Sequence, residues 1–123
     1  MKKKILVVDD ESDIVKTTAI ALELDGYAVY TAATGVEAIA TIRRCSPDLV
    51  IIDMILPEMS GKDVVRWIKR SPEYQHVPVI LITALAQKSE KEALEEENID
   101  SYLIKPFDLG HLERKVKELL RAP

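Results

Sequence analysis

The chain has 123 residues and a formal net charge of −4. This length fits one domain of ordinary size, and a hydrophobic fraction of 47% is typical of a globular protein with a buried core. The acidic balance argues against a nucleic-acid-binding surface, which needs clustered Lys and Arg. No apolar run approaches the roughly 18 residues of a membrane helix, so we expect no membrane association and a cytoplasmic location. A single cysteine, Cys45, excludes an internal disulfide.

Five segments have the composition of β-strands. Three are continuous, β-branched apolar runs over residues 5–8, 49–52 and 79–82. Such runs are typical of strands buried on both faces of a parallel sheet. The segment over residues 27–32 is more mixed and is a candidate edge strand, and residues 102–104 form the last predicted strand.

A helical pattern follows each predicted strand. Gly26 follows the first pattern as a stop signal, and Pro47 and Pro72 limit the second and the third. The last pattern is strongly amphipathic, whereas the fourth is rich in charge. The five patterns cover residues 14–25, 36–42, 64–68, 88–97 and 109–120.

The strict alternation of strand and helix predicts a three-layer α/β domain with a parallel sheet. Right-handed crossovers restrict its topology, and the most natural choice is a flavodoxin-like (βα)5 sandwich with strand order 2-1-3-4-5. We expect residues 1–123 to form this single domain. Ligands of such sheets bind beyond the carboxyl ends of the strands.

Polar side chains follow four of the predicted strands at this edge. Asp9 and Asp10 follow the first strand, Asp53 the third, Thr83 the fourth and Lys105 the fifth. A single aspartate would be explained most simply as a helix cap. Neighbouring carboxylates, however, raise one another's pKa unless a cation offsets them, and Mg²⁺ prefers carboxylates, waters and phosphate oxygens. The three acids together therefore predict a divalent-cation site.

Asp53 also suits phosphoryl chemistry. A carboxylate can act as a nucleophile and form an acyl phosphate if a metal neutralises the charge. Pro57 and Gly61 shape the loop after Asp53, which leaves room for a phosphoryl group. Lys105 would help to balance the charge of that group. Alone, a Thr or a Lys at a strand end would be ordinary.

Together these motifs resemble the receiver domain of response regulators, the phosphoacceptor module of two-component signalling. The resemblance covers nearly the whole chain, and its motifs each lie at a strand end. Any one motif would be a weak signal, but all four in this order are very specific. They are VDDE at residues 8–11, DMILPEMSG at 53–61, TA at 83–84 and YLIKPF at 102–107.

The resemblance implies a role for each matching position. Asp53 corresponds to the phosphoacceptor and also to a metal ligand. Asp10 corresponds to the acid that binds Mg²⁺, or alternatively Mn²⁺, directly, while Asp9 helps through metal-bound water. The backbone carbonyl of Ile55 corresponds to a further protein ligand. Lys105 corresponds to the lysine that contacts both the acceptor and the phosphoryl group.

A conformational switch is implied as well. Thr83 corresponds to the hydroxyl that turns toward the phosphoryl group, and Tyr102 to the aromatic ring that changes rotamer with it. The bond between Lys105 and Pro106 is expected to be cis.

Two aliphatic side chains occupy places that influence access of water in the family. They are Ile55, two residues after the acceptor, and Leu85, two residues after Thr83. Neither can position a water molecule, so we expect slow self-dephosphorylation.

The resemblance also implies partners. The phosphoryl donor would be a sensor histidine kinase or a histidine phosphotransfer protein. The receiver would act on a downstream effector protein or an appended output domain, through the face of the fourth helix, the fifth strand and the fifth helix. It would catalyse only its own phosphorylation and dephosphorylation, and dimerisation on phosphorylation is left open.

Two other functions are weighed against this one. A receiver-like interaction module would work without phosphorylation, but the complete set of acids, Thr and Lys argues against it. An aspartyl-phosphate phosphohydrolase of the haloacid-dehalogenase type would carry Asp-x-Asp after the first strand. Here that strand ends in Asp9 and Asp10, and the chain leaves little room for a substrate cap.

Overall fold

A computed structural model of the protein describes residues 1–84 and 99–121. The predicted helix over residues 88–97 and Leu85 lie outside these described residues. The strands are β1 Lys4–Val8, β2 Ala28–Ala32, β3 Leu49–Asp53, β4 Val79–Thr83 and β5 Ser101–Ile104. The described helices are α1 Ser12–Leu24, α2 Gly35–Cys45, α3 Gly61–Arg70 and α5 Leu109–Leu120.

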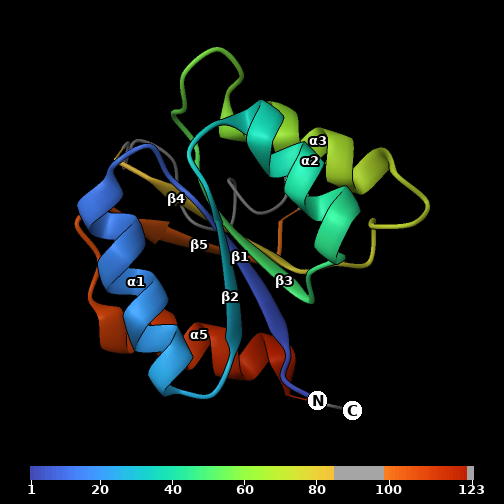
Figure 1. Ribbon diagram of the computed structural model, residues 1–123. Coiled ribbons are helices and arrows are strands. Elements are labelled where there is room, and N and C mark those ends of the chain that lie inside the picture. Colours follow the sequence, from blue (N-terminus) through green and yellow to red (C-terminus); the bar gives the residue numbers. More distant parts are fainter. Residues whose placement is uncertain (85–98, 122–123) are drawn as a thin grey trace.

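The strands form one parallel sheet in the order β2-β1-β3-β4-β5 (Figure 1). This order confirms the predicted flavodoxin-like topology and places the mixed strand β2 at an edge. The register pairs Val8 of β1 with Ile52 of β3, so these two strands end side by side. Their carboxyl ends therefore bring the residues that follow them to one place at the edge of the sheet.

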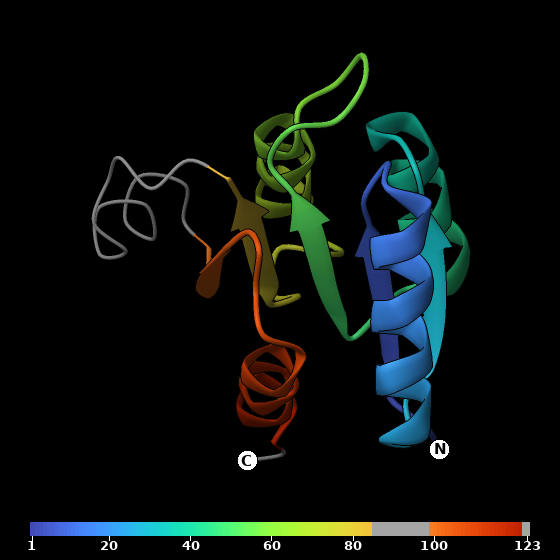
Figure 2. The same ribbon diagram turned by 90° about the vertical axis from the view of Figure 1, so that its left-hand side faces the viewer.

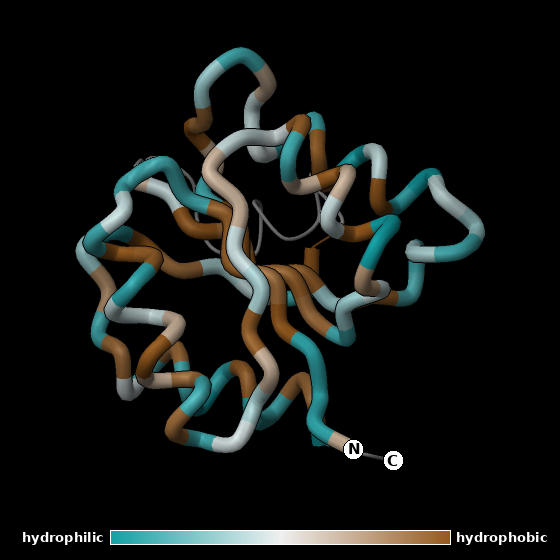
Figure 3. The backbone as a smooth tube through the Cα atoms, in the orientation of Figure 1, coloured by the Kyte–Doolittle hydropathy of each residue, from teal (hydrophilic) through white to brown (hydrophobic). Residues whose placement is uncertain are grey.

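Alternate residues of the strands are buried on opposite faces of the sheet. Leu6 and Val8 pack in the cluster beneath α2 and α3, whereas Ile5 and Val7 pack in the cluster beneath α1 and α5. Figures 1 and 2 show these two helix pairs on opposite sides of the sheet. Burial on both faces explains why the inner strands β1, β3 and β4 are almost continuously apolar and lack an alternating polar face (Figure 3).

Local signals fix where the helices begin and end. The hydroxyl of Ser60 accepts a hydrogen bond from the N–H of Asp63 at 3.2 Å, which caps α3 directly after the β3 loop. Gly26 ends the turn after α1 with a φ of 101°, a conformation that favours glycine. Within residues 1–84 and 99–121, no helix is long and apolar enough to cross a membrane.

Candidate functional site

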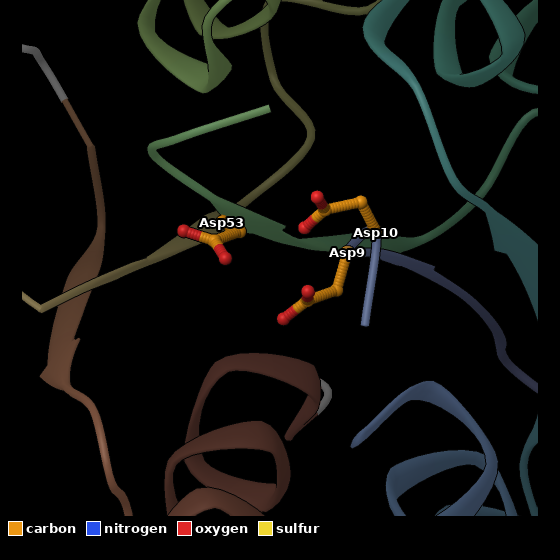
Figure 4. Close-up of side chains that lie close together, drawn as sticks. All are labelled: Asp9, Asp10 and Asp53. Atoms are coloured by element: carbon orange, nitrogen blue, oxygen red, sulfur yellow. The ribbon is translucent and has the colours of Figure 1, made fainter. Parts of the chain in front are cut away.

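Three carboxylates meet where β1 and β3 end. Asp9 and Asp10 follow β1, and Asp53 is the last residue of β3. Figure 4 shows the three side chains reaching into one space. One oxygen from each lies within 4.8 Å of the others, a spacing that a single divalent cation can bridge. Asp9 and Asp53 are buried and Asp10 is exposed, so the cluster opens to solvent on one side.

The Lys105 ammonium lies among these acids. Its Nζ is 2.7 Å from Asp53 Oδ2, 3.0 Å from Asp9 Oδ2 and 2.7 Å from Glu11 Oε1. The Lys105 side chain is only 13% exposed, so these ion pairs are screened less than pairs on the surface. The bond between Lys105 and Pro106 is cis, as expected.

Burial and charge act in opposite directions on these groups. Burial raises the pKa of Asp9, since a carboxylate away from water is disfavoured; the hydrogen bond from the Glu11 N–H and the contact with Lys105 offset this only in part. Burial alone would lower the pKa of Lys105, but its bonds to Asp53, Glu11 and Asp9 outweigh that effect and raise it. The ammonium is therefore charged at neutral pH, while the site disfavours charge on Asp9.

The loop after β3 fixes the position of Asp53. Its Oδ1 accepts a hydrogen bond from the backbone N–H of Ile55 at 3.1 Å, and Gly61 N–H donates to Met54 O at 2.8 Å. A Cβ on Gly61 would lie 2.1 Å from the carbonyl oxygen of Asp53, so only glycine allows this close approach. The start of α3 thus packs directly against the strand end that carries Asp53.

A hollow of about 280 Å³ opens beside the Asp53 carboxylate. The side chain of Ile55 is 58% exposed at its rim and offers no polar atom to a ligand. The hollow can admit a small anion next to both Asp53 and the Lys105 ammonium. Among the residues that the structure describes, those that line it are Asp10, Glu11, Asp53, Ile55, Ala84 and Lys105.

Thr83 and Tyr102 are both buried, at 0% and 7% exposure. Thr83 ends β4, and its carbonyl accepts a hydrogen bond from the Lys105 N–H at 2.7 Å, which ties the two strand ends together. Tyr102 packs in the cluster beneath α2 and α3. The roles of both residues in switching remain predictions.

The contact between Glu11 and Lys105 was not predicted from the sequence. Glu11 appeared in the VDDE motif without a role, although it directly follows Asp10 at the same strand end. It occupies the N-cap position of α1, but its side chain makes no capping hydrogen bond. The carboxylate binds Lys105, which lies 94 residues away in the sequence.

Comparison with known proteins agrees with this fold. The family model described as "Response regulator receiver domain" matches residues 5–117. The polar-differentiation response regulator DivK of Brucella ovis is 32% identical over 120 residues, which cover 98% of each chain.

Solved structures with the same fold include receivers of several bacteria. The chemotaxis response regulator CheY4 of Vibrio cholerae has a TM-score of 0.89 at 28% identity, and the match covers 98% of this chain and 100% of that one. A putative response regulator from Chloroflexus aurantiacus has a TM-score of 0.90 at 31% identity, with 99% and 100% coverage. The chain belongs to the response regulator receiver domain family, a family of signalling proteins.

Proposed function

We propose that this receiver accepts a phosphoryl group on Asp53 in a reaction that depends on Mg²⁺, with Mn²⁺ as an alternative. The observation that carries the proposal is the position of the Asp53 carboxylate. It belongs to the three-acid cluster, lies 2.7 Å from the Lys105 ammonium and faces a hollow open to solvent. A nucleophile, a cation site and a charge-balancing amine are thus adjacent.

The donor set fits a hard divalent cation. Asp9, Asp10 and Asp53 would hold it, together with the backbone carbonyl of Ile55. Three carboxylates stand beside the single Lys105 ammonium, so in their ionised forms they carry more negative charge than Lys105 alone balances. The neighbouring Asp53 accordingly contributes to the raised pKa of Asp9, after the larger effect of burial. When bound, the cation would neutralise charge on the carboxylates and on the phosphoryl oxygens.

The chain's own groups carry the transfer. An Asp53 oxygen would attack the phosphorus of a phosphohistidine, so that a P–O bond forms while the P–N bond breaks. The electron pair of that bond leaves with the imidazole of the donor protein. Lys105 would keep its contact with Asp53 and would also contact an oxygen of the phosphoryl group, where it balances the charge.

The signal would leave the site through β4 and β5. Thr83 would turn its hydroxyl toward the phosphoryl group, and Tyr102 would change rotamer in response. A local change in charge would thereby bias a two-state surface. The surface would include β5 and α5, at the sheet edge farthest from β2.

The partners follow from this chemistry. A sensor histidine kinase or a histidine phosphotransfer protein would donate the phosphoryl group within the cytoplasm. An effector protein or an appended output domain would read the result, and residues 1–123 would act as one receiver domain that modifies only itself. The names of the relatives concern polar differentiation and chemotaxis, which are two different outputs. We therefore propose phosphoryl acceptance for this chain and no particular pathway.

Intact-mass analysis tests the proposal. The wild-type protein is incubated with acetyl phosphate and Mg²⁺, and a parallel sample contains EDTA. We expect a gain of one phosphoryl group with Mg²⁺ only, and no gain in Asp53→Asn. A wild-type protein that stays unmodified, or an Asp53→Asn variant that gains the group, would contradict the proposal.

A further inference from the structure

The Lys105 ammonium is surrounded by carboxylates in the resting site. An ammonium has three N–H donors, and three carboxylate oxygens lie within 3.0 Å of Nζ, from Asp53, Asp9 and Glu11. A phosphoryl oxygen that arrives at Asp53 needs one of these donors. Lys105 must therefore release at least one of its present partners.

The three partners differ in how easily they are released. Asp9 is 3% exposed and its other oxygen accepts the Glu11 N–H at 2.9 Å, so its position is fixed. Asp53 is the proposed acceptor itself. The Glu11 side chain is 59% exposed and does not belong to the three-acid cluster. Since Glu11 has no other described role at the site, its carboxylate is the partner that can leave.

There is space to receive the released carboxylate. Glu11 and Lys105 line both the 280 Å³ hollow beside Asp53 and a second cavity of about 630 Å³. The second cavity lies between α1 and the segment from β5 to α5, with Ile14 and Phe107 among its walls. The Glu11 side chain therefore borders a second space besides the hollow at Asp53, into which its carboxylate can turn.

We propose that Glu11 is a positioning residue that holds the Lys105 ammonium in its resting place and must release it when Asp53 is phosphorylated. The inference rests on the proposed function. In the resting state Glu11 occupies one N–H of the Lys105 ammonium and offsets the positive charge that would attract an anionic phosphoryl donor. It also adds a negative charge at the entrance to the hollow beside Asp53. Each of these effects opposes phosphorylation, so Glu11 limits its rate.

Three variants separate this contact from a general effect of charge. Glu11→Gln keeps the size of the side chain and removes its charge. Glu11→Asp keeps the charge but is one methylene shorter, so its carboxylate no longer reaches Lys105. Asp13→Asn removes an exposed charge from the first turn of the same helix and serves as the control. Thermal melts establish that each variant is folded.

The rate of phosphorylation by phosphoramidate at saturating Mg²⁺ is the first measurement. We expect a rise of about threefold in Glu11→Gln and in Glu11→Asp, the size of a partly exposed ion pair. The Asp13→Asn rate should match wild type. The inference would be overturned if Glu11→Gln were phosphorylated no faster than wild type. It would also be overturned if Asp13→Asn showed the same rise in rate, or if Glu11→Asp showed none.

The second measurement needs neither a donor nor a metal. The NMR signal of the Lys105 ammonium reports how fast its protons exchange with water. We expect faster exchange in Glu11→Gln and Glu11→Asp than in wild type and Asp13→Asn, and equal rates in all four would contradict the contact. Failure of the wild type to become phosphorylated would instead overturn the proposed function, while this signal still shows whether Glu11 holds Lys105.

Discussion

At the residue scale, two effects act in opposite directions on the charged groups of the site. Burial removes them from water, whereas neighbouring groups of opposite charge attract them. Asp9 and Asp53 are buried at 3% and 6% exposure and share one ammonium. Leaving water disfavours the charged form of a carboxylate, whereas a cation within hydrogen-bonding distance favours it. For Asp9 the first effect is larger, so its pKa is raised in the folded protein. A second cation would remove this imbalance.

The raised pKa of Asp9 predicts a specific pH dependence. Because the folded protein binds the proton on Asp9 more tightly than the unfolded chain does, ionised Asp9 destabilises the metal-free fold. This contribution is absent below the usual value of 3.8 and grows as the pH rises through the raised pKa. We therefore expect the stability of Asp9→Asn relative to wild type to rise with pH over the range above about pH 4 and then to level off.

Urea denaturation in EDTA at several pH values measures this difference. A stability difference that stays constant or falls across this range would contradict the burial effect. With Mg²⁺ the wild type should gain stability and the variant should gain less, because Asp9→Asn lacks a charged group of the site.

Ile55 predicts a slow loss of the phosphoryl group. Its side chain is 58% exposed at the rim of the hollow beside Asp53, and it offers no hydrogen-bonding group to an attacking water. We expect Ile55→Asn to shorten the phosphoryl half-life several-fold, and Ile55→Val to leave it near the wild-type value. The decay of the phosphorylated mass after removal of the donor measures this, and an equal or longer half-life in Ile55→Asn would refute the prediction.

Gly61 gives a prediction about backbone packing at the site. A Cβ there would lie 2.1 Å from the Asp53 carbonyl oxygen, which must then move. We expect Gly61→Ala to lower the free energy of unfolding by about 2 kcal/mol, as overpacking does. Gly110→Ala is the matched control, since its Cβ would meet nothing nearer than 3.7 Å, and it should gain roughly 0.5 kcal/mol as a helical Ala. Urea denaturation compares them, and equal effects would contradict the argument.

At the element scale, the inner strands could be predicted because strands that are buried on both faces have continuous apolar sequences. Residues 49–52 are buried on both faces and lie within β3, and the mixed segment over residues 27–32 gave the edge strand β2. The helical pattern predicted over residues 64–68 lies within α3. Contacts such as that of Glu11 with Lys105 could not be predicted, because they depend on how side chains from distant elements meet.

Asp100 shows how one such contact joins elements. Its Oδ2 accepts a hydrogen bond from the Val79 N–H at 2.8 Å and lies 3.4 Å from the Lys69 ammonium, so it links α3 to the start of β4. We expect Asp100→Ala to cost about 1–2 kcal/mol, because it leaves the N–H of a buried residue without this acceptor. Asp100→Asn, which keeps an acceptor, should cost less. Chemical denaturation tests the ranking, and equal losses would contradict the role of the Val79 bond.

At the scale of the whole molecule, the strand order assembles the site. β1 and β3 are neighbours, so Asp9 and Asp10 meet Asp53 although Asp53 lies more than 40 residues further along the sequence. β4 lies between β3 and β5, and the long side chain of Lys105 spans that distance past the small Ala84. The sequence allowed the order and the convergence to be predicted, since parallel strands present their carboxyl ends at one edge.

The central claim is that Asp53 carries the phosphoryl group, and trapping the acyl phosphate tests it most directly. Borohydride reduces an aspartyl phosphate to homoserine, which peptide mass spectrometry can then locate. After treatment with acetyl phosphate and Mg²⁺, we predict homoserine at position 53 and no modification in EDTA. Homoserine at position 9 or 10, or at no position, would contradict the account.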